Sequence, residues 1–195
     1  MQSFPTQNLP SFTQYLAGFP KNGNDFIRGA DTIYSIVGGA VLQARLDYPK
    51  ETENTCALRV SIALTKCNIV IPHIPGQTIE GGGDFAGKYF FVNARALNSW
   101  MRKTFGTNTG EDNTPYNPKH ESFSGEQGGL YGQNFPALLK NKKGIYSLIT
   151  LNNSNTTVTG HADVFNGYGN NKKICSNGCF FSKLPVERID IWILD

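Results

Sequence analysis

Two positions far apart in the 195-residue sequence carry residue types suited to nucleophilic chemistry. Cys56 follows Asn54 and Thr55, either of which is a good helix N-cap. A thiol in the first turn of a helix lies at the positive end of the helix dipole, which favours thiolate over thiol. His161 opens the alternating segment GHADVFNG. Because a cysteine nucleophile needs a base that takes its proton, the two residues predict a Cys–His site.

Such a site also needs a third group that holds the histidine in the right orientation. Asp163 lies two residues after His161, on the same face of the expected strand. Asn177 lies inside the motif CSNGC, between Cys175 and Cys179. An amide can orient the base as well as a carboxylate can, as in the Cys-His-Asn arrangement of papain-like enzymes. The residues alone leave both candidates open.

Each of these residues also has a structural interpretation. A helical cysteine that faces the core is by default a small buried hydrophobe, and a lone strand histidine is more often structural than catalytic. The spacing of Cys175 and Cys179 around an Asn-Gly turn allows a disulfide that is stable in an oxidising compartment. His73 and His120 are isolated, so the sequence predicts neither a metal site nor a cofactor.

The elements that must position these residues follow from local patterns. Val60, Ala63, Leu64 and Cys67 follow Cys56 at the spacing of one helical face. A second helix is predicted for NARALNSWMRKTF, capped by Asn93 and ended by Gly106, after a short strand KYFFV. Strands are then predicted for GIYSLITL, GHADVFNG and RIDIWILD. Helices followed by strands favour an α+β fold with an antiparallel sheet, in which His161 faces the helix start across the sheet edge.

The length favours one domain over residues 1–195. Residues 1–24 form a polar, proline-containing lead-in with a short, loosely packed helix near residues 11–17. Gly38-Gly39 interrupts an apolar segment, where the backbone must bend tightly or approach another element closely. Residues 106–135 are polar and glycine-rich without a clear period, which predicts one long loop with a functional or mobile role.

Charge and hydropathy exclude several classes of protein. The net charge is only +3, and the basic residues are scattered, which argues against a nucleic-acid binder but is compatible with weak attraction to an anionic cell wall. The N-terminus lacks the basic and continuous apolar regions of a secretory signal. Apolar runs stop far short of the ~18 residues that suggest a membrane span, so we expect no membrane insertion.

Several segments occur together in the order and rough spacing of a known family: SIVGGAVLQ, NTCALRVSIAL, KGIYSLITL, GHADVFNG, CSNGC and the terminal WILD. In these segments the sequence resembles the fourth family of type VI secretion amidase effectors. The resemblance runs from about residue 31 to the C-terminus, and its most specific parts are the helix start around Cys56 and the Gly-His strand. It implies a papain-like fold of the NlpC type, with N-terminal helices and the nucleophile helix packed on a C-terminal antiparallel sheet.

The resemblance assigns roles to individual residues. Cys56 corresponds to the nucleophile and His161 to the base. The family has an aspartate inside the C-x-x-x-C turn, where this sequence has Asn177. We favour Asn177 as the orienting group because its position matches, with Asp163 as the alternative. The resemblance also implies a disulfide between Cys175 and Cys179 that pins the third residue against the histidine.

The implied function is hydrolysis of peptidoglycan stem peptides at the γ-D-glutamyl–meso-diaminopimelate bond. The backbone N–H of Cys56 is then an oxyanion donor, and Arg59 is expected to meet an acidic side chain or, alternatively, a substrate carboxylate. The implied partners are a cognate immunity protein and the type VI secretion apparatus, which delivers the protein to the periplasm of the target bacterium. The alternatives are a non-catalytic cell-wall-binding module and a cysteine transferase on the same fold.

Overall fold

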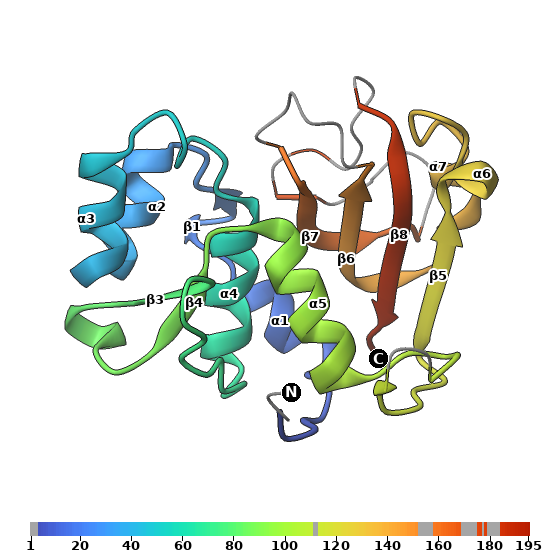
Figure 1. Ribbon diagram of the computed structural model, residues 1–195, viewed down its shortest axis with the longest axis horizontal. Helices are drawn as coiled ribbons and strands as arrows, with labels where there is room; N and C mark the ends of the chain where they lie inside the picture. The colour runs from blue at the N-terminus through green and yellow to red at the C-terminus, as the bar shows by residue number, and fades with distance from the viewer. Residues whose placement is uncertain (1–3, 111–112, 152–157, 169–174, 177, 179–183) are drawn as a thin grey trace.

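A computed structural model describes residues 4–110, 113–151, 158–168, 175–176, 178 and 184–195. Helices and short hairpins gather beside α4 on one side, and a four-stranded sheet forms the other side (Figure 1). This is the predicted α+β class. The elements in chain order are α1 Phe12–Gly18, β1 Lys21–Asn22, β2 Asp25–Phe26, α2 Ala30–Val37, α3 Gly39–Asp47, α4 Cys56–Lys66, β3 Thr78–Glu80, η1 Gly83–Phe85, β4 Tyr89–Phe91, α5 Ala94–Phe105, β5 His120–Ser124, α6 Gly125–Gly128, α7 Phe135–Leu138, β6 Lys143–Thr150, β7 Gly160–Asn166 and β8 Val186–Ile193.

The main sheet has the strand order β5-β8-β6-β7, and all of its pairs are antiparallel. The three strands predicted in the C-terminal third are therefore confirmed as β6, β7 and β8. Among the described strands, β7 lies at one edge of the sheet and pairs with β6, which places Leu148 opposite His161 and Tyr146 opposite Asp163. The strand that carries the candidate base is thus the strand of this sheet that lies next to α4 (Figure 1).

Helix α4 is the central helix, because every residue from Cys56 to Leu64 is buried. One side of it packs in a cluster with α1, α5 and the sheet, through residues such as Val60 and Leu64. Its other side, with Leu58 and Ile62, packs against α2 and α3. A helix that is apolar all round is fixed from every direction. Packing on both sides therefore determines where Cys56 lies.

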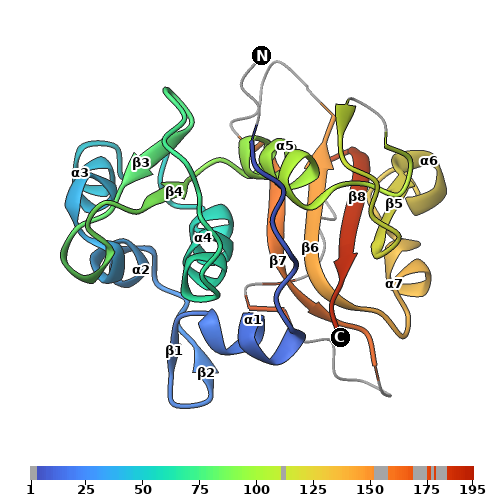
Figure 2. The ribbon, with the colours of Figure 1, turned by 90° about the horizontal axis from the view of Figure 1, so that it is seen from below.

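Helix α5 lies across the sheet, next to β6 and β7 (Figure 2). Its predicted ends are confirmed. The side chain of Asn93 accepts a hydrogen bond from the N–H of Ala96, and Gly106 ends the helix with a φ of 83°. The opposite face of the sheet packs on α7, where Phe135, Tyr146 and Ile189 are fully buried.

The predicted close approach at Gly38-Gly39 is confirmed at the junction of α2 and α3. Gly39 has a φ of 58°, and a Cβ there would lie 2.5 Å from the carbonyl carbon of Gly81. A Cβ on Gly82 would lie 2.5 Å from the backbone nitrogen of Gly39. The N–H of Gly82 also donates to the carbonyl oxygen of Val37 over 2.9 Å. Two backbones therefore cross here in direct contact, which only glycine permits.

The prediction of one long loop over residues 106–135 is wrong. This range contains β5 and α6, and α7 begins at its end. β5 pairs along its length with β8, for example Ser122 with Asp190. β5 is stabilised by its pairing with β8, which is distant in the chain, and by the burial of His120. Neither contact produces a periodic pattern of apolar residues in the local sequence.

The N-terminal helix is confirmed as α1, with a capping box between Ser11 and Gln14. The expected loose packing is wrong, because Phe12, Tyr15 and Phe19 are all buried against α4 and the sheet. Within the described residues, we find no helix whose length and hydropathy would let it span a bilayer.

Candidate active site

Cys56 is the first residue of α4 and is only 2% exposed. It lines a cavity of about 480 Å³ together with His161 and Gly178. The remaining wall comes from residues 50–54 after α3, from the start of α5, and from the segment that enters β7. The predicted meeting of the thiol and the imidazole is therefore confirmed, at the mouth of a cavity large enough for part of a peptide.

Steric crowding explains why a glycine precedes His161. A Cβ on Gly160 would lie 2.3 Å from the carbonyl oxygen of Leu148 in β6. The absence of a side chain lets β7 begin close against β6. The ring of Tyr146 packs edge-on against the imidazole of His161, with ring centroids 5.9 Å apart. Strand pairing and ring packing together limit where the imidazole can point.

His161 makes polar contacts in two directions. Its Nε2 donates to the carbonyl oxygen of Gly178 over 2.7 Å and lies 3.5 Å from Oδ2 of Asp163. Its ring also hydrogen-bonds the side chain of Cys56. Burial alone lowers the pKa of His161, but the contacts with Asp163 and Cys56 outweigh this effect and raise it from 6.5 to about 10. The structure therefore favours an imidazolium beside the sulfur at neutral pH.

Asp163 is fully buried, and its carboxylate contacts several groups at once. Its Oδ1 accepts from the N–H of Val164 over 2.7 Å and from the N–H of Ser176 over 2.9 Å. Ser176 belongs to the CSNGC motif, so the carboxylate ties this segment to β7. Of the two candidates for orienting the base, Asp163 is the one whose contact with His161 the structure describes. Asn177 and Cys179 lie outside the described residues.

Arg59 lies one turn after Cys56 and is 1% exposed. Its Nε donates to Oγ1 of Thr55 over 2.7 Å, and its Nη1 donates to the carbonyl oxygen of Ile27. Burial lowers the pKa of Arg59, while the nearby Asp163 and Cys56 raise it. Because the guanidinium is buried, it is not placed to meet a substrate carboxylate. Its positive charge instead lies near the acidic groups of the site.

The backbone N–H of Cys56, the predicted oxyanion donor, already has a partner. It donates to Oδ1 of Asn54 over 3.1 Å. The N-cap residue is Thr55, but its side chain makes no capping bond. Asn54 is exposed and lines the cavity. The N–H thus becomes available to a substrate oxygen when the Asn54 side chain moves aside.

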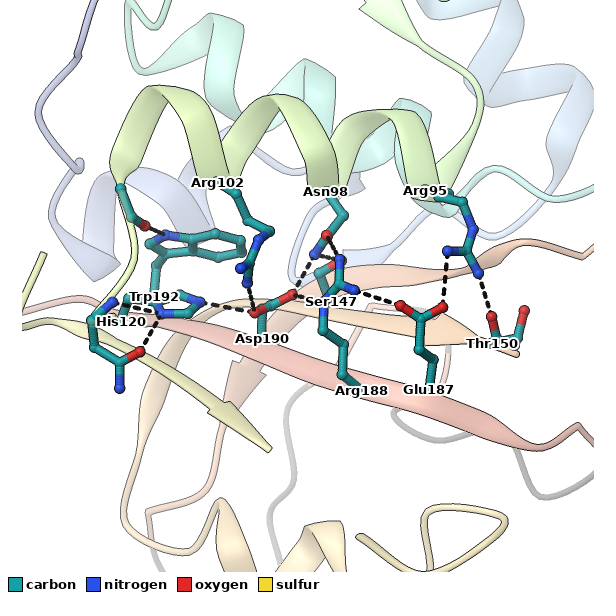
Figure 3. Close-up of polar contacts among 12 residues, drawn as sticks. Arg95, Asn98, Arg102, His120, Ser147, Thr150, Glu187, Arg188, Asp190 and Trp192 are labelled. Carbon is teal, nitrogen blue, oxygen red and sulfur yellow. Dashed lines mark hydrogen bonds and ion pairs between the residues drawn. The ribbon is translucent and has the colours of Figure 1, made fainter. Parts of the chain in front are cut away.

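A buried polar network lies between α5 and the sheet, and we did not predict it (Figure 3). Its centre is Asp190 on β8, which is fully buried. Oδ1 of Asp190 accepts from Arg102 over 2.8 Å and from His120 over 2.9 Å, and its Oδ2 accepts from Asn98 over 2.8 Å and from Arg188 over 3.1 Å. Despite burial, these donors lower the pKa of Asp190. The network fastens α5 to the sheet.

Among the residues that the structure describes, no three His, Cys, Asp or Glu side chains are grouped so that they could hold a metal ion.

A helix that carries a cysteine at its start, packed against an antiparallel sheet that carries a histidine, defines an α+β fold of the NlpC/P60 type. Residues 52–193 match the sequence profile described as type VI secretion system (T6SS), amidase effector protein 4. The chain belongs to this family of amidase effectors, as the resemblance predicted. A comparison with curated proteins found no match.

Solved structures with the same fold are similar over almost the whole chain. The Tae4–Tai4 effector–immunity complex of Salmonella Typhimurium has 22% identity and a TM-score of 0.66, covering 95% of this chain and 99% of that one. The effector Tae4 of Enterobacter cloacae has 20% identity and a TM-score of 0.67, covering 98% and 100%. The Tae4–Tai4 complex of Enterobacter cloacae has 21% identity and a TM-score of 0.66, covering 95% and 99%.

Proposed function

We propose that this amidase effector hydrolyses peptidoglycan stem peptides at the γ-D-glutamyl–meso-diaminopimelate bond, with the thiolate of Cys56 as nucleophile. The observation that carries this proposal is that Cys56, the first residue of α4, and His161 line the same cavity, with the thiol close enough to raise the pKa of the imidazole. Membership of an amidase effector family supports the reaction class.

The reaction then proceeds in two halves. The Cys56 sulfur attacks the glutamyl carbonyl carbon and forms a C–S bond. The carbon–nitrogen bond breaks, and the His161 imidazolium gives its proton to the departing amine of diaminopimelate. A water molecule next loses a proton to the neutral imidazole and attacks the thioester. The C–S bond breaks, which releases the glutamyl acid and restores the thiolate–imidazolium pair.

The negative oxygen of each tetrahedral intermediate needs donors close to Cys56. We assign this role to the backbone N–H of Cys56, which substrate frees by displacing the side chain of Asn54. That side chain also carries an amide N–H₂ group at the cavity. Asn54 thus covers the N–H in the resting protein and can donate to the oxyanion once it has turned.

The orienting role falls to Asp163 together with the carbonyl oxygen of Gly178. Nε2 of His161 donates to the carbonyl oxygen of Gly178 over 2.7 Å and lies 3.5 Å from Oδ2 of Asp163. In the proposed arrangement the second ring nitrogen exchanges the proton with the sulfur. The variants compared below test whether Asn177, the alternative, orients His161 instead. We also propose the Cys175–Cys179 disulfide, which would close the segment that Asp163 holds through Ser176.

The rim of the cavity suits a zwitterionic substrate. On the segment that follows α3, Lys50 brings a positive charge and Glu51 a negative one, while Glu53 already pairs with Arg45 over 3.2 Å. The distal carbon of meso-diaminopimelate carries both an ammonium and a carboxylate. A rim with charges of both signs offers each of them a partner.

The biological setting follows from the family. We propose delivery by the type VI secretion apparatus into the periplasm of a target bacterium, where oxidising conditions support a disulfide. Relatives of this fold are solved in complex with an immunity protein. We propose that a cognate immunity protein likewise binds this chain and protects the producing cell.

Digestion of purified sacculi that contain diaminopimelate tests the proposed function. We expect release of disaccharide-dipeptide fragments ending in D-glutamate, identified by chromatography and mass spectrometry. Fragments cut at another bond would correct the bond specificity, and the absence of any fragment would refute the amidase.

Replacing Asp163 with asparagine tests the orienting role, because it keeps the shape and removes the charge. We expect kcat to fall about 10²-fold or more with little change in KM. Because Asp163 raises the pKa of His161, the alkaline limb of the pH profile should move to lower pH. A merely structural role would not move this limb. Asn177→Ala is the matched comparison, and a larger loss there than at Asp163 would give the role to Asn177.

A further inference from the structure

A second cavity, of about 610 Å³, lies next to the catalytic one. The two cavities share Asn93 and Thr159 as lining residues. Oγ1 of Thr159 donates to Oδ1 of Asn93 over 3.3 Å, so these two hydrogen-bonded side chains lie where the cavities meet. A substrate held in the catalytic cavity can therefore continue into the second one.

The second cavity follows one face of α5. Asn93 caps the helix, and Ala96, Ser99 and Lys103 follow at intervals of three or four residues. Ten residues of helix rise about 15 Å, which is the distance along α5 from Asn93 to Lys103. An extended peptide covers roughly 3.3–3.6 Å per residue, so diaminopimelate and one residue after it span about 7 Å, and the long Lys103 side chain, which leans back towards the start of the helix, has to cover the remaining distance.

The charged groups that line the second cavity are all positive. Among its described lining residues, Arg95 and Lys103 are basic and none is acidic. The catalytic cavity differs, because Glu51 and Glu53 line it. A carboxylate is therefore favoured in the second cavity and disfavoured at the acidic part of the first.

Arg95 is held in place by the sheet (Figure 3). Its Nη1 donates to Oε2 of Glu187 over 2.9 Å, and its Nη2 donates to the carbonyl oxygen of Thr150. Glu187 also accepts from Arg188 over 2.6 Å. Arg188 and Arg102 in turn share Asp190, so three guanidinium groups face two carboxylates and one positive charge is in excess. Lys103 is exposed at the far end and is free to turn towards a bound anion.

We propose that the second cavity is a subsite for the C-terminal carboxylate of the stem peptide, carried there by the residues that follow diaminopimelate. The inference rests on the proposed function, because it assigns a direction to the same substrate. It predicts that the protein distinguishes a stem peptide with a free carboxylate from the same peptide with a terminal amide.

Binding is measured separately from cleavage. Cys56→Ala protein is titrated by calorimetry with the tetrapeptide L-Ala-γ-D-Glu-diaminopimelate-D-Ala as the acid and as the amide. We expect the acid to bind about threefold to fivefold more tightly at low salt, as for a partly exposed ion pair. The preference should decline as the salt concentration rises. Adding Lys103→Gln should remove most of this preference, and Lys103→Glu should reverse it.

Lys66→Gln is the matched control. Lys66 is also an exposed lysine in the last turn of a helix, and it lines neither cavity. It should keep the full preference for the acid. Equal affinities for acid and amide, a preference that survives both changes at Lys103, or no measurable binding would each overturn the inference. Failure of the unsubstituted protein to cleave either peptide would instead overturn the proposed function.

Discussion

Cys56→Ala will abolish the release of peptide fragments from sacculi while the circular dichroism spectrum stays unchanged. The sulfur forms the covalent bond to the substrate, and an alanine methyl group cannot replace it. Removal of a nucleophile in comparable hydrolases lowers kcat by about 10⁴-fold or more. Because Cys56 lies at the start of α4 with its thiol facing a cavity, the loss of one atom leaves helix packing intact. The measurement is the rate of fragment release at saturating substrate.

Cys67 provides the control inside the same helix region. It is a free thiol after the end of α4, and burial raises its pKa. Cys67→Ala should therefore keep activity, and iodoacetamide at mildly acid pH should modify Cys56 first. Full activity in the Cys56 variant would remove this residue from the mechanism. An inactive natural protein with an unreactive Cys56 would favour the non-catalytic binding module instead.

Asp190→Asn will lower the free energy of unfolding by about 3–5 kcal/mol, the cost of breaking a buried ion pair from one side. The change removes the negative charge that Arg102, Arg188 and His120 surround, so the two partly buried guanidinium groups lose their attraction to it. For a chain of this size the thermal midpoint should fall by roughly 10 °C. Asp195→Asn is the control, because Asp195 pairs with Lys119 at the surface and its loss should change stability little.

The same carboxylate gives a pH dependence with a definite sign. The folded pKa of Asp190 is lowered below its ordinary value of 3.8, so its stabilisation is fully present above that value. It is lost as the pH falls through the folded pKa. The stability difference between the natural protein and Asp190→Asn should stay constant from neutral pH down to about pH 5 and shrink in stronger acid. A constant difference at all pH values would contradict this assignment.

The places of Cys56 and His161, the proposed catalytic pair, could be predicted because local signals agreed at both residues. Apolar period and capping residues placed Cys56 at a helix start, and alternation after a glycine placed His161 at a strand start. The resemblance added the roles. We then expected Cys56 and His161 to meet across the sheet edge, because an α+β fold offers few other arrangements in which a helix start lies beside a strand start.

The rest of the site depends on contacts between distant segments. The carbonyl oxygen of Gly178 carries no sequence signal, because every residue has one. Asp190 did carry a signal, since it is the one charged residue between Ile189 and Ile193, in the apolar part of β8. A charged residue at such a position requires buried partners. Those partners come from α5 and β5, and β5 itself was predicted as loop.

The glycine crossing at Gly39 and Gly82 has a consequence for the distant catalytic cavity. Backbone touches backbone there, so the hairpin of α2 and α3 cannot approach β3 and β4 more closely. The segment leaving α3 carries Lys50, Glu51 and Glu53 and forms the outer wall around Cys56. A methyl group at Gly39 or Gly82 would push the two backbones apart, and we expect it to displace the segment that leaves α3 and with it this wall of the cavity.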